Sequence, residues 1–446
     1  MKGKRKTLMQ LFFPICLETL CFMLAGMVDT LMLSTLNDQA VGAVGTANTY
    51  ISLFIMMFSV VSSGMIAVMT QYIGAGRTGV AHQAKRFGLI FNGILGALLS
   101  TVLLFWSDEV LRIVGVADNL VGYAGLYMEI VGGTIILNAI IPIFSYYVRA
   151  FGHAKSPMIA TVVSNIVNLV LNAVFLFVLD WGVAGVAYAT VISRVVNLII
   201  VVITAFKVED ENQERENVPF SQLFKQILQV GLPSAAESAL YNVAMTFMFR
   251  FLNQMDAEGF NVAARSYATQ ITNFSFCVGA ALAQANAILT GWRIGSGEYE
   301  ECDKGTKKAA LIGIFVAAGF ECVLALLSPF IMQLFTKDAE LIKVVTTLMW
   351  IDVALEIGRC SNLVFGQALK TSGDAMFTTI LGAIFMFLCA VGGTYLFGIK
   401  LELMVVGAYI GLAADECFRA VGMFLRWKSG IWKKKTLIKP NAKVEG

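Results

Sequence analysis

The sequence predicts an all-α polytopic membrane protein, with twelve transmembrane helices in two six-helix lobes that are related by a parallel internal repeat. Three observations predict this fold class: the composition, apolar runs of bilayer length, and motifs that recur half a chain apart. Of the 446 residues, 57% are hydrophobic and 14% are charged, against roughly 25% charged residues in soluble domains. Too few polar residues remain to cover such a chain in water, so its outer surface should face lipid.

The apolar residues form continuous runs, and a helix needs about 20 such residues to cross the roughly 30 Å hydrocarbon layer of a bilayer. Because the runs are continuous and do not alternate apolar with polar residues, they predict helices that satisfy their own backbone groups. Arg265 and Asn286 interrupt the eighth run. The twelve runs lie at approximately 8–33, 46–71, 88–106, 120–147, 157–179, 183–206, 226–252, 261–290, 309–333, 341–368, 376–397 and 402–426.

The basic residues predict how the chain crosses the membrane. With twelve spans both termini lie on one side, and the termini and the loops of that side hold 24 of the 33 lysines and arginines. Basic residues are retained in the cytoplasm. We therefore expect a multi-pass protein of the plasma membrane, of the bacterial inner-membrane type, with both termini cytoplasmic. The basic tail should face anionic lipid, and no nucleic-acid partner is expected.

Short motifs recur at an offset close to half of the chain length. Pro14 and Glu18 match Pro233 and Glu237, 219 residues later. Further matches, at offsets of 221 or 222 residues, join Ile73–Gly76 to Ile294–Gly297, Arg149–Gly152 to Lys370–Gly373, and Val183–Tyr188 to Val405–Tyr409. Because each copy has an even number of spans, the second copy enters the membrane in the same orientation as the first.

The repeat also predicts the division of the chain. We expect two lobes that rock around a central site, which is the arrangement that alternating access requires. The joint should be the charged segment around Pro219. The predicted parts are an N-terminal lobe at 1–206, a cytoplasmic linker at 207–225, a C-terminal lobe at 226–426 and a basic cytoplasmic tail at 427–446.

Asp29 is the leading candidate for a functional carboxylate. It lies in the first span, and no basic residue of that helix can neutralise it. An ionisable residue inside a membrane is costly and marks an ion or substrate path by default. A buried carboxylate without a partner binds a proton or a cation. The alternative is that Asp29 lies near the outer water and is only solvated.

Neutral polar residues extend this candidate site. Asn165, Asn168 and Asn172 are spaced by three and four residues on span 5, so they form one stripe, and Thr190 lies in span 6. Amide and hydroxyl oxygens beside a carboxylate suit a hard cation. Asp29, Asn168, Asn172 and Thr190 are therefore the candidate sodium ligands. Alternatively, the asparagines only join neighbouring helices.

Further charges lie within the other spans. Glu18 and Glu237, each four residues after a proline, are either structural or part of ion coupling, and Glu129 and Glu321 have no partner in the sequence. In spans 10 and 12, spacings of three and four residues allow ion pairs along one helix face. These ion pairs either pack between helices or line the transport path, and the residues concerned are Asp352, Glu356, Arg359, Asp415, Glu416 and Arg419.

With these motifs in this order, the whole chain resembles the multidrug and toxic compound extrusion (MATE) family. The motifs that carry the resemblance are Val28–Met32, Gln71–Gly76, Arg149–Gly152, the Asn168 and Asn172 stripe, and Gly185–Thr190. The resemblance implies an antiporter that expels organic, often cationic compounds and is driven by sodium or proton entry. It also implies coupling roles for Asp29, Asn168 and Thr190.

The sequence departs from the family pattern at three positions. Asn172 stands where one branch of the family has Asp. In the second lobe Glu237 lies one turn before the family glutamate, and Arg359 takes the place of the family aspartate, with Glu356 one turn away. A sodium site in the C-terminal lobe is therefore not implied, and the coupling ion is left open between sodium and a proton.

Three other functions compete with this interpretation. The first is a lipid or lipid-linked precursor flippase of the same wider superfamily, for which a positively lined groove would be expected. The second is an unrelated exporter with six plus six spans, and the third is a channel. Since catalytic motifs are absent from the sequence, no enzyme is expected. We expect no cofactor, a small organic cation as substrate, since carboxylates outnumber arginines in the spans, and a monomer in the bilayer.

Overall fold

The computed structural model describes residues 6–113, 115–116, 118–212, 216–256 and 258–438. All regular secondary structure within these ranges is helical, which confirms the predicted fold class. Of the basic residues counted above for the orientation in the membrane, five lie outside the described ranges: Lys2, Lys4, Arg5, Lys439 and Lys443. Residues 213–215 of the predicted linker also lie outside them.

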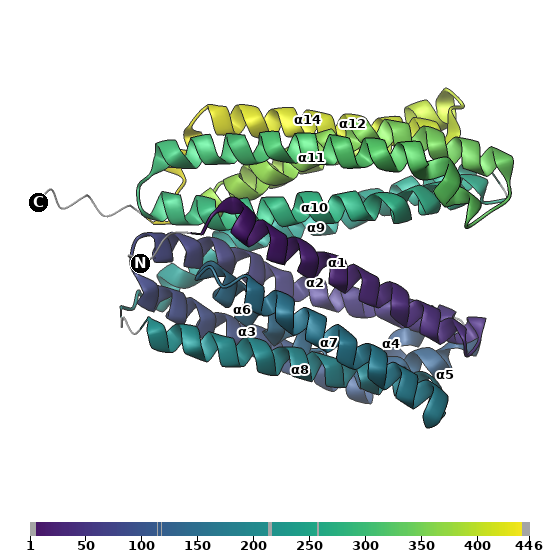
Figure 1. The fold of residues 1–446 in the computed structure, drawn as a ribbon, viewed down its shortest axis with the longest axis horizontal. Coiled ribbons are helices and arrows are strands. Elements are labelled where there is room, and N and C mark those ends of the chain that lie inside the picture. The colour runs from purple at the N-terminus through teal and green to yellow at the C-terminus, as the bar shows by residue number, and fades with distance from the viewer. Residues whose placement is uncertain (1–5, 114, 117, 213–215, 257, 439–446) are drawn as a thin grey trace, which may run out of the picture. The chain divides into compact units, whose positions relative to one another are not determined.

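Six helical segments cover the first half of the chain (Figure 1), and a short helix, α4, joins the third segment to the fourth. Two segments contain wider π-helical turns, which the sequence did not predict. The elements are α1 (Leu8–Ser34), α2 (Asp38–Gly74), α3 (Thr78–Phe105), α4 (Ser107–Ile113), α5 (Asp118–Tyr127) with η1 (Met128–Gly132) and α6 (Ile136–Ala150), α7 (Lys155–Ala173) with η2 (Val174–Val178), and α8 (Gly182–Glu211).

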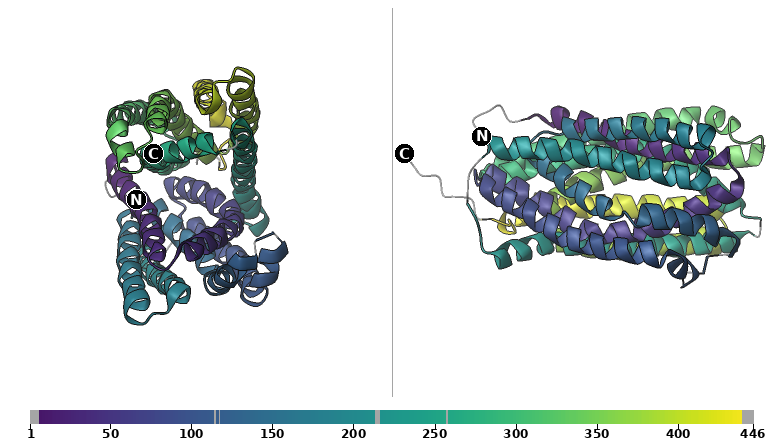
Figure 2. Two further views of the ribbon diagram at one scale, coloured as in Figure 1. Left: turned by 90° about the vertical axis from the view of Figure 1, so that its right-hand side faces the viewer. Right: turned by 90° about the horizontal axis from the view of Figure 1, so that it is seen from below.

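Six more segments follow in the second half, and their order repeats that of the first half. The long helices of each half run alongside one another in the two views of Figure 2. The elements are α9 (Phe220–Met255), α10 (Phe260–Gly295), α11 (Tyr299–Gln333), α12 (Ala339–Ser372), α13 (Ala375–Phe385) with η3 (Met386–Val391) and η4 (Thr394–Lys400), α14 (Met404–Lys428) and the short η5 (Ile431–Lys434). Among the described residues, twelve long segments thus match the predicted number of spans.

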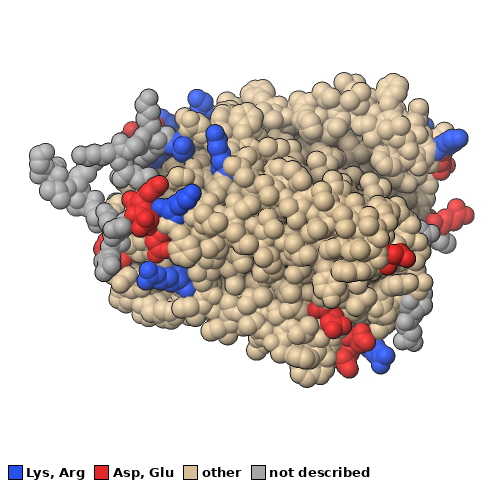
Figure 3. All heavy atoms as spheres, turned by 60° about the horizontal axis from the view of Figure 1, so that its bottom comes forward, with Lys and Arg blue, Asp and Glu red and all other residues tan. Residues whose placement is uncertain are grey.

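Within the described part of the chain, eight helices are long and apolar enough to cross a membrane. The number rises to nine if Leu120–Gly132 and Ile136–Ala150, which are bent by 43° at the break between them, count as one span. The three remaining long helices, α9, α12 and α14, carry most of the predicted intramembrane charges of the second half, while Glu321 lies on α11. On the face that Figure 3 shows, the charged side chains gather at the two ends, and the band between them is uncharged, as a lipid-facing surface requires.

The repeated sequence motifs appear as repeated helix ends. Gly76 and Gly297 end α2 and α10 with φ values of 79° and 78°. Gly152 and Gly373 likewise follow α6 and α12 with φ values of 86° and 102°. Glycine is favoured at these positions because other residues are strained in the left-handed conformation.

The chain forms two compact units, which we describe separately. The first contains Phe13–Gly231, and the second contains Leu232–Gly446 together with Thr7–Phe12. The boundary between Gly231 and Leu232 therefore falls inside α9. Both ends of the predicted linker at 207–225 are helical, since α8 continues to Glu211 and α9 begins at Phe220. Glu209 near the end of α8 is held by ion pairs with Lys85 and Arg86 of α3.

Candidate functional site

In the first unit, Asp29 of α1 meets the asparagine stripe of α7. The Asn172 amide donates a hydrogen bond to Asp29 Oδ1 at 2.7 Å and one to Asn168 Oδ1 at 3.2 Å. Asn165, one turn earlier, donates to the Cys21 carbonyl of α1 at 2.8 Å. Asn172 is fully buried, and its Oδ1 atom has no hydrogen-bond partner among the described residues. The stripe therefore joins two helices and also leaves one amide oxygen free beside the carboxylate.

Thr190 of α8 belongs to the same region, although its hydroxyl donates to the Val186 carbonyl of its own helix at 2.9 Å. The side chain of Tyr127, at the end of α5, interacts with the side chains of Thr190 and Asn48. Tyr127 is 3% exposed. Thr190 is therefore linked to a buried hydroxyl, and no hydrogen bond to Asp29 is formed.

Arg194 supplies the positive charge that α1 lacks. It lies one turn after Thr190 on α8, and its charge acts on both Asp29 and Tyr127. No direct ion pair joins Arg194 to Asp29, and Arg194 Nη1 has no hydrogen-bond partner in the described part of the chain. Arg194 was not among the predicted site residues; its spacing of four residues from Thr190 places both on one face of α8, but nothing in the sequence shows that this face lies near Asp29.

The two carboxylates that follow prolines have partners at matching places in the two units. Glu18 pairs with Arg149 at 2.5 Å, and Glu237 pairs with Lys370 at 3.0 Å. Arg149 and Lys370 are the first residues of one of the repeated motifs. The repeat therefore reproduces an ion pair between the first and fourth helical segments of each half, which the sequence analysis did not foresee.

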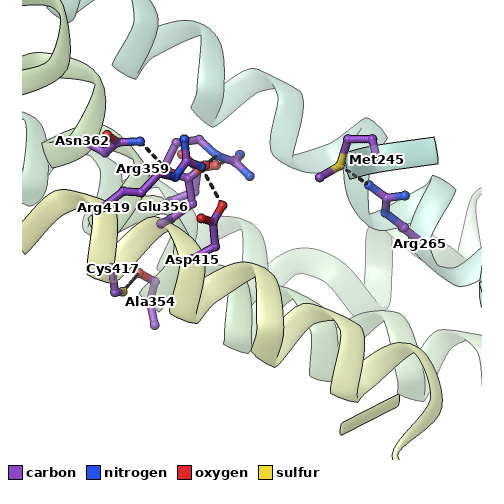
Figure 4. Close-up of polar contacts among 10 residues, drawn as sticks. Met245, Arg265, Ala354, Glu356, Arg359, Asn362, Asp415, Cys417 and Arg419 are labelled. Atoms are coloured by element: carbon purple, nitrogen blue, oxygen red, sulfur yellow. Dashed lines mark hydrogen bonds and ion pairs between the residues drawn. The ribbon is translucent and has the colours of Figure 1, made fainter. Parts of the chain in front are cut away.

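The charges of α12 and α14 form a single network in the second unit (Figure 4). The pairs expected within each helix are present: Arg359 contacts Glu356, and Arg419 contacts Asp415 at 2.7 Å and Glu416 at 2.9 Å. Arg359 also reaches Glu416 of α14 at 3.4 Å. Glu416 therefore lies between two guanidinium groups, so the network joins α12 to α14.

Two further acidic side chains meet at the edge of this network. Asp352 of α12 interacts electrostatically with Glu321 of α11, and neither carboxylate oxygen of Glu321 has a hydrogen-bond partner among the described residues. Glu321 is fully buried and Asp352 is 1% exposed. Glu321 had no identifiable partner in the sequence, because nothing there shows that α11 and α12 bring these positions together. Glu129, the other single carboxylate, is exposed.

A cavity of about 470 Å³ lies within the second unit. The predicted site residues on its wall are Glu237, Asp352, Arg359, Glu416 and Arg419. Glu356 and Asp415 are not part of this wall. The wall also contains Arg265 and Lys370, and aromatic rings such as Tyr241 and Phe276. Within the described residues, the nearby His, Cys, Asp and Glu side chains form no group of three suited to a metal.

Comparisons with known proteins identify the family to which these helices and repeated motifs belong. The sequence model of the MatE family matches residues 14–174 and 233–396. An uncharacterized transporter of Bacillus subtilis, YisQ, is 30% identical over 97% of this chain and 96% of its own length. A probable multidrug resistance protein of Thermotoga maritima, NorM, is 24% identical over 97% of this chain and 94% of its own length.

The fold is also that of a known transporter. A crystal structure of MATE in complex with MaD3S superimposes with a TM-score of 0.85, at 24% identity and with 96% of each chain covered. The two matched segments correspond to the two sequence repeats, and each contains one of the paired carboxylates Glu18 and Glu237. The chain is therefore a member of the multidrug and toxic compound extrusion family of membrane transporters.

Proposed function

We propose that this chain is an antiporter that exports small organic compounds, with lipophilic cations as the main class, and that sodium or proton entry drives the export. The observation that carries the proposal is the contact between Asp29 and Asn172, which places a carboxylate without an ion pair beside a free, buried amide oxygen.

The Asp29 cluster has the properties that a coupling site needs. Asp29 can bind a proton, or it can hold sodium together with the side-chain oxygens of Asn168, Asn172 and Thr190, since hard cations prefer oxygen ligands. Arg194 acts on Asp29 without pairing directly with it. An ion that binds here and later leaves would change the balance of charge in the first unit during every transport cycle.

Relatives of this chain support small organic molecules as substrates. They include the probable multidrug resistance protein NorM and the multidrug export protein MepA of Staphylococcus aureus. The expectation of cationic substrates came from a surplus of carboxylates. The ion pairs of Glu18 and Glu237 reduce this surplus, while Asp29, Asp352 and Glu321 have no direct ion pair among the described residues.

The arrangement in the membrane is part of the same proposal. The lobes at 1–206 and 226–426, joined by the linker at 207–225, move relative to one another so that the substrate site opens to one side at a time. The protein lies in the plasma membrane as a monomer, with both termini and the tail at 427–446 in the cytoplasm.

The test is transport in proteoliposomes with sodium and pH gradients imposed separately. In the Asp29→Asn variant, we expect uphill export of a lipophilic cationic dye to be abolished under both gradients, because the amide neither titrates nor carries charge. The matched control is Glu109→Gln, which neutralises an exposed carboxylate on α4 of the same unit. Uphill export at the wild-type rate by Asp29→Asn would remove Asp29 from the mechanism.

A further inference from the structure

The cavity of the second unit contains one guanidinium that no carboxylate neutralises. Arg265 lies near the beginning of α10, lines the cavity and is 7% exposed. Within the described residues it forms no ion pair, and its Nε and Nη1 atoms have no hydrogen-bond partner. Nη2 contacts only the Met245 sulfur, at 3.3 Å. Figure 4 shows Arg265 and Met245 apart from the charge network of α12 and α14.

The other basic residues of the cavity wall differ from Arg265 in this respect. Lys370 is paired with Glu237, and Arg359 and Arg419 share the carboxylates of α12 and α14. Their charges are therefore balanced within the protein. Among the described residues the charge of Arg265 has no such counterpart, and burying an unpaired charge destabilises a fold. A buried group with this cost is a candidate for ligand binding.

Two hydrogen-bond donors of Arg265 are buried without a partner among the described residues. The guanidinium carbon lies 4.1 Å from the centre of the Phe249 ring, so the cationic face is partly compensated by the aromatic face. A guanidinium donates hydrogen bonds in its own plane and binds carboxylate or phosphate through two parallel bonds. Nε and Nη1 are such donors, and neither is used by the protein.

We propose that Arg265 binds the anionic group of the transported compound, so that the substrates of this cavity are amphipathic molecules with a carboxylate or a phosphate. This assignment of Arg265 rests on the proposed export function and deepens it: the substrate has a negative group in addition to its positive group. The cavity volume of about 470 Å³ suits a small organic molecule. Tyr241, Met245 and Phe276 offer an apolar surface to its body, and Asp352 offers a carboxylate to its cationic end.

The test is equilibrium binding to the purified full-length chain in a neutral detergent, measured by fluorescence anisotropy. The probes are a zwitterionic rhodamine with a free benzoate and the same dye as its methyl ester, which keeps the cation and the rings. We expect the wild type to bind the acid at least about tenfold more tightly than the ester, since two charge-assisted hydrogen bonds are lost on esterification. In Arg265→Met the ratio of the two dissociation constants should fall to about one.

Two variants control for indirect effects. Arg250→Met removes an exposed arginine of α9 that does not line the cavity, and it should keep the wild-type ratio. Arg265→Lys keeps the charge and should restore part of the preference for the acid. The melting temperature of each variant in detergent shows whether it is folded. An unchanged ratio in a folded Arg265→Met protein would overturn the proposal.

The anionic group has two sources, a soluble amphipath or a membrane lipid, and competition distinguishes them. Micelles doped with phosphatidylglycerol displace the acid dye if the site takes a lipid phosphate, whereas a soluble aromatic carboxylate displaces it if the site takes soluble compounds. Displacement by neither competitor would contradict an anion site at Arg265. Because binding in detergent needs no ion gradient, this result is independent of the transport assay on Asp29.

Discussion

At the residue scale, several intramembrane charges of this chain have a neutralising partner on another helix. Glu18 meets Arg149, Glu237 meets Lys370, and Glu416 receives Arg359 from the neighbouring helix. In a low dielectric, such pairs hold helices together in one arrangement, and removing one partner leaves an uncompensated charge. Asp29 and Arg265, like Asp352 and Glu321, lack a direct ion pair among the described residues, and we propose functional roles for the first two.

Removing Arg359 alone should damage the second unit strongly. Arg359→Gln leaves Glu356 without its cation and removes one of the two guanidinium groups beside Glu416. We therefore expect a loss of about 3–5 kcal/mol in the free energy of unfolding. The double change Glu356→Gln with Arg359→Gln should cost much less, because no carboxylate at position 356 is then left without its cation, and in both variants Glu416 keeps Arg419 at 2.9 Å. Denaturant titration in detergent micelles measures both values.

The matched control is Lys307→Gln. Lys307 forms an ion pair with Asp303 at 2.7 Å, and its side chain is 45% exposed, so the loss should stay below about 1 kcal/mol. If the single and double changes in α12 impaired transport equally while stability stayed intact, the network would have a direct role in transport and not a structural one.

At the scale of helices, close backbone approaches determine how the segments pack. In the first unit α2 meets the beginning of α9 at Gly64, where an added Cβ would lie 2.1 Å from the Ile227 carbonyl oxygen. Gly231 makes a similar approach to the Val60 carbonyl, at 1.8 Å. Small residues at such crossings let two helices pack backbone to backbone in a membrane, where van der Waals packing replaces much of the hydrophobic driving force.

A methyl group at Gly64 should separate α2 from α9. We expect Gly64→Ala to lower the free energy of unfolding by about 1–3 kcal/mol, since the contact atom is backbone and cannot rotate away. Gly93→Ala on α3 is the control, because nothing lies within 4 Å of its added Cβ. It should be neutral or stabilise the helix by up to about 1 kcal/mol. Equal effects of the two changes in denaturant titration would contradict this account of the packing.

At the scale of the whole molecule, the internal repeat determines the topology. Because each half has an even number of predicted membrane segments, we expect the two halves to cross the membrane in the same orientation. The repeated glycine ends and the repeated ion pairs agree with the internal repeat. The uneven distribution of lysine and arginine then predicts which side of the membrane is cytoplasmic.

Fusions at the two ends test this orientation. Green fluorescent protein joined after Gly446, or before Met1, should be fluorescent in cells, because it matures in the cytoplasm. Alkaline phosphatase at the same two positions should be inactive, since it needs the oxidising side of the membrane. A phosphatase insertion in the Lys337–Asp338 turn, on the opposite side, serves as the positive control. Active phosphatase at either terminus would reverse the proposed topology.

Features that depend on composition and local spacing could be predicted from the amino-acid sequence. The apolar runs, the repeat, the ion pairs within α12 and α14 and the stripe of Asn165, Asn168 and Asn172 all follow from the requirements of a helix in lipid. The continuous helix α10 was also expected, although Arg265 and Asn286 made its limits uncertain.

Which helices face one another could not be predicted from the sequence and is seen in the folded chain. The partners of Glu18, Glu237 and Glu321, the contact of Asn172 with Asp29, and the position of Arg194 near Asp29 join residues far apart in the chain. Local spacing cannot show such contacts, because any face of a membrane helix can be turned toward lipid or toward a neighbour. For the same reason the unpaired state of Arg265 was not visible in the sequence: a charge is unpaired only with respect to all the helices packed around it.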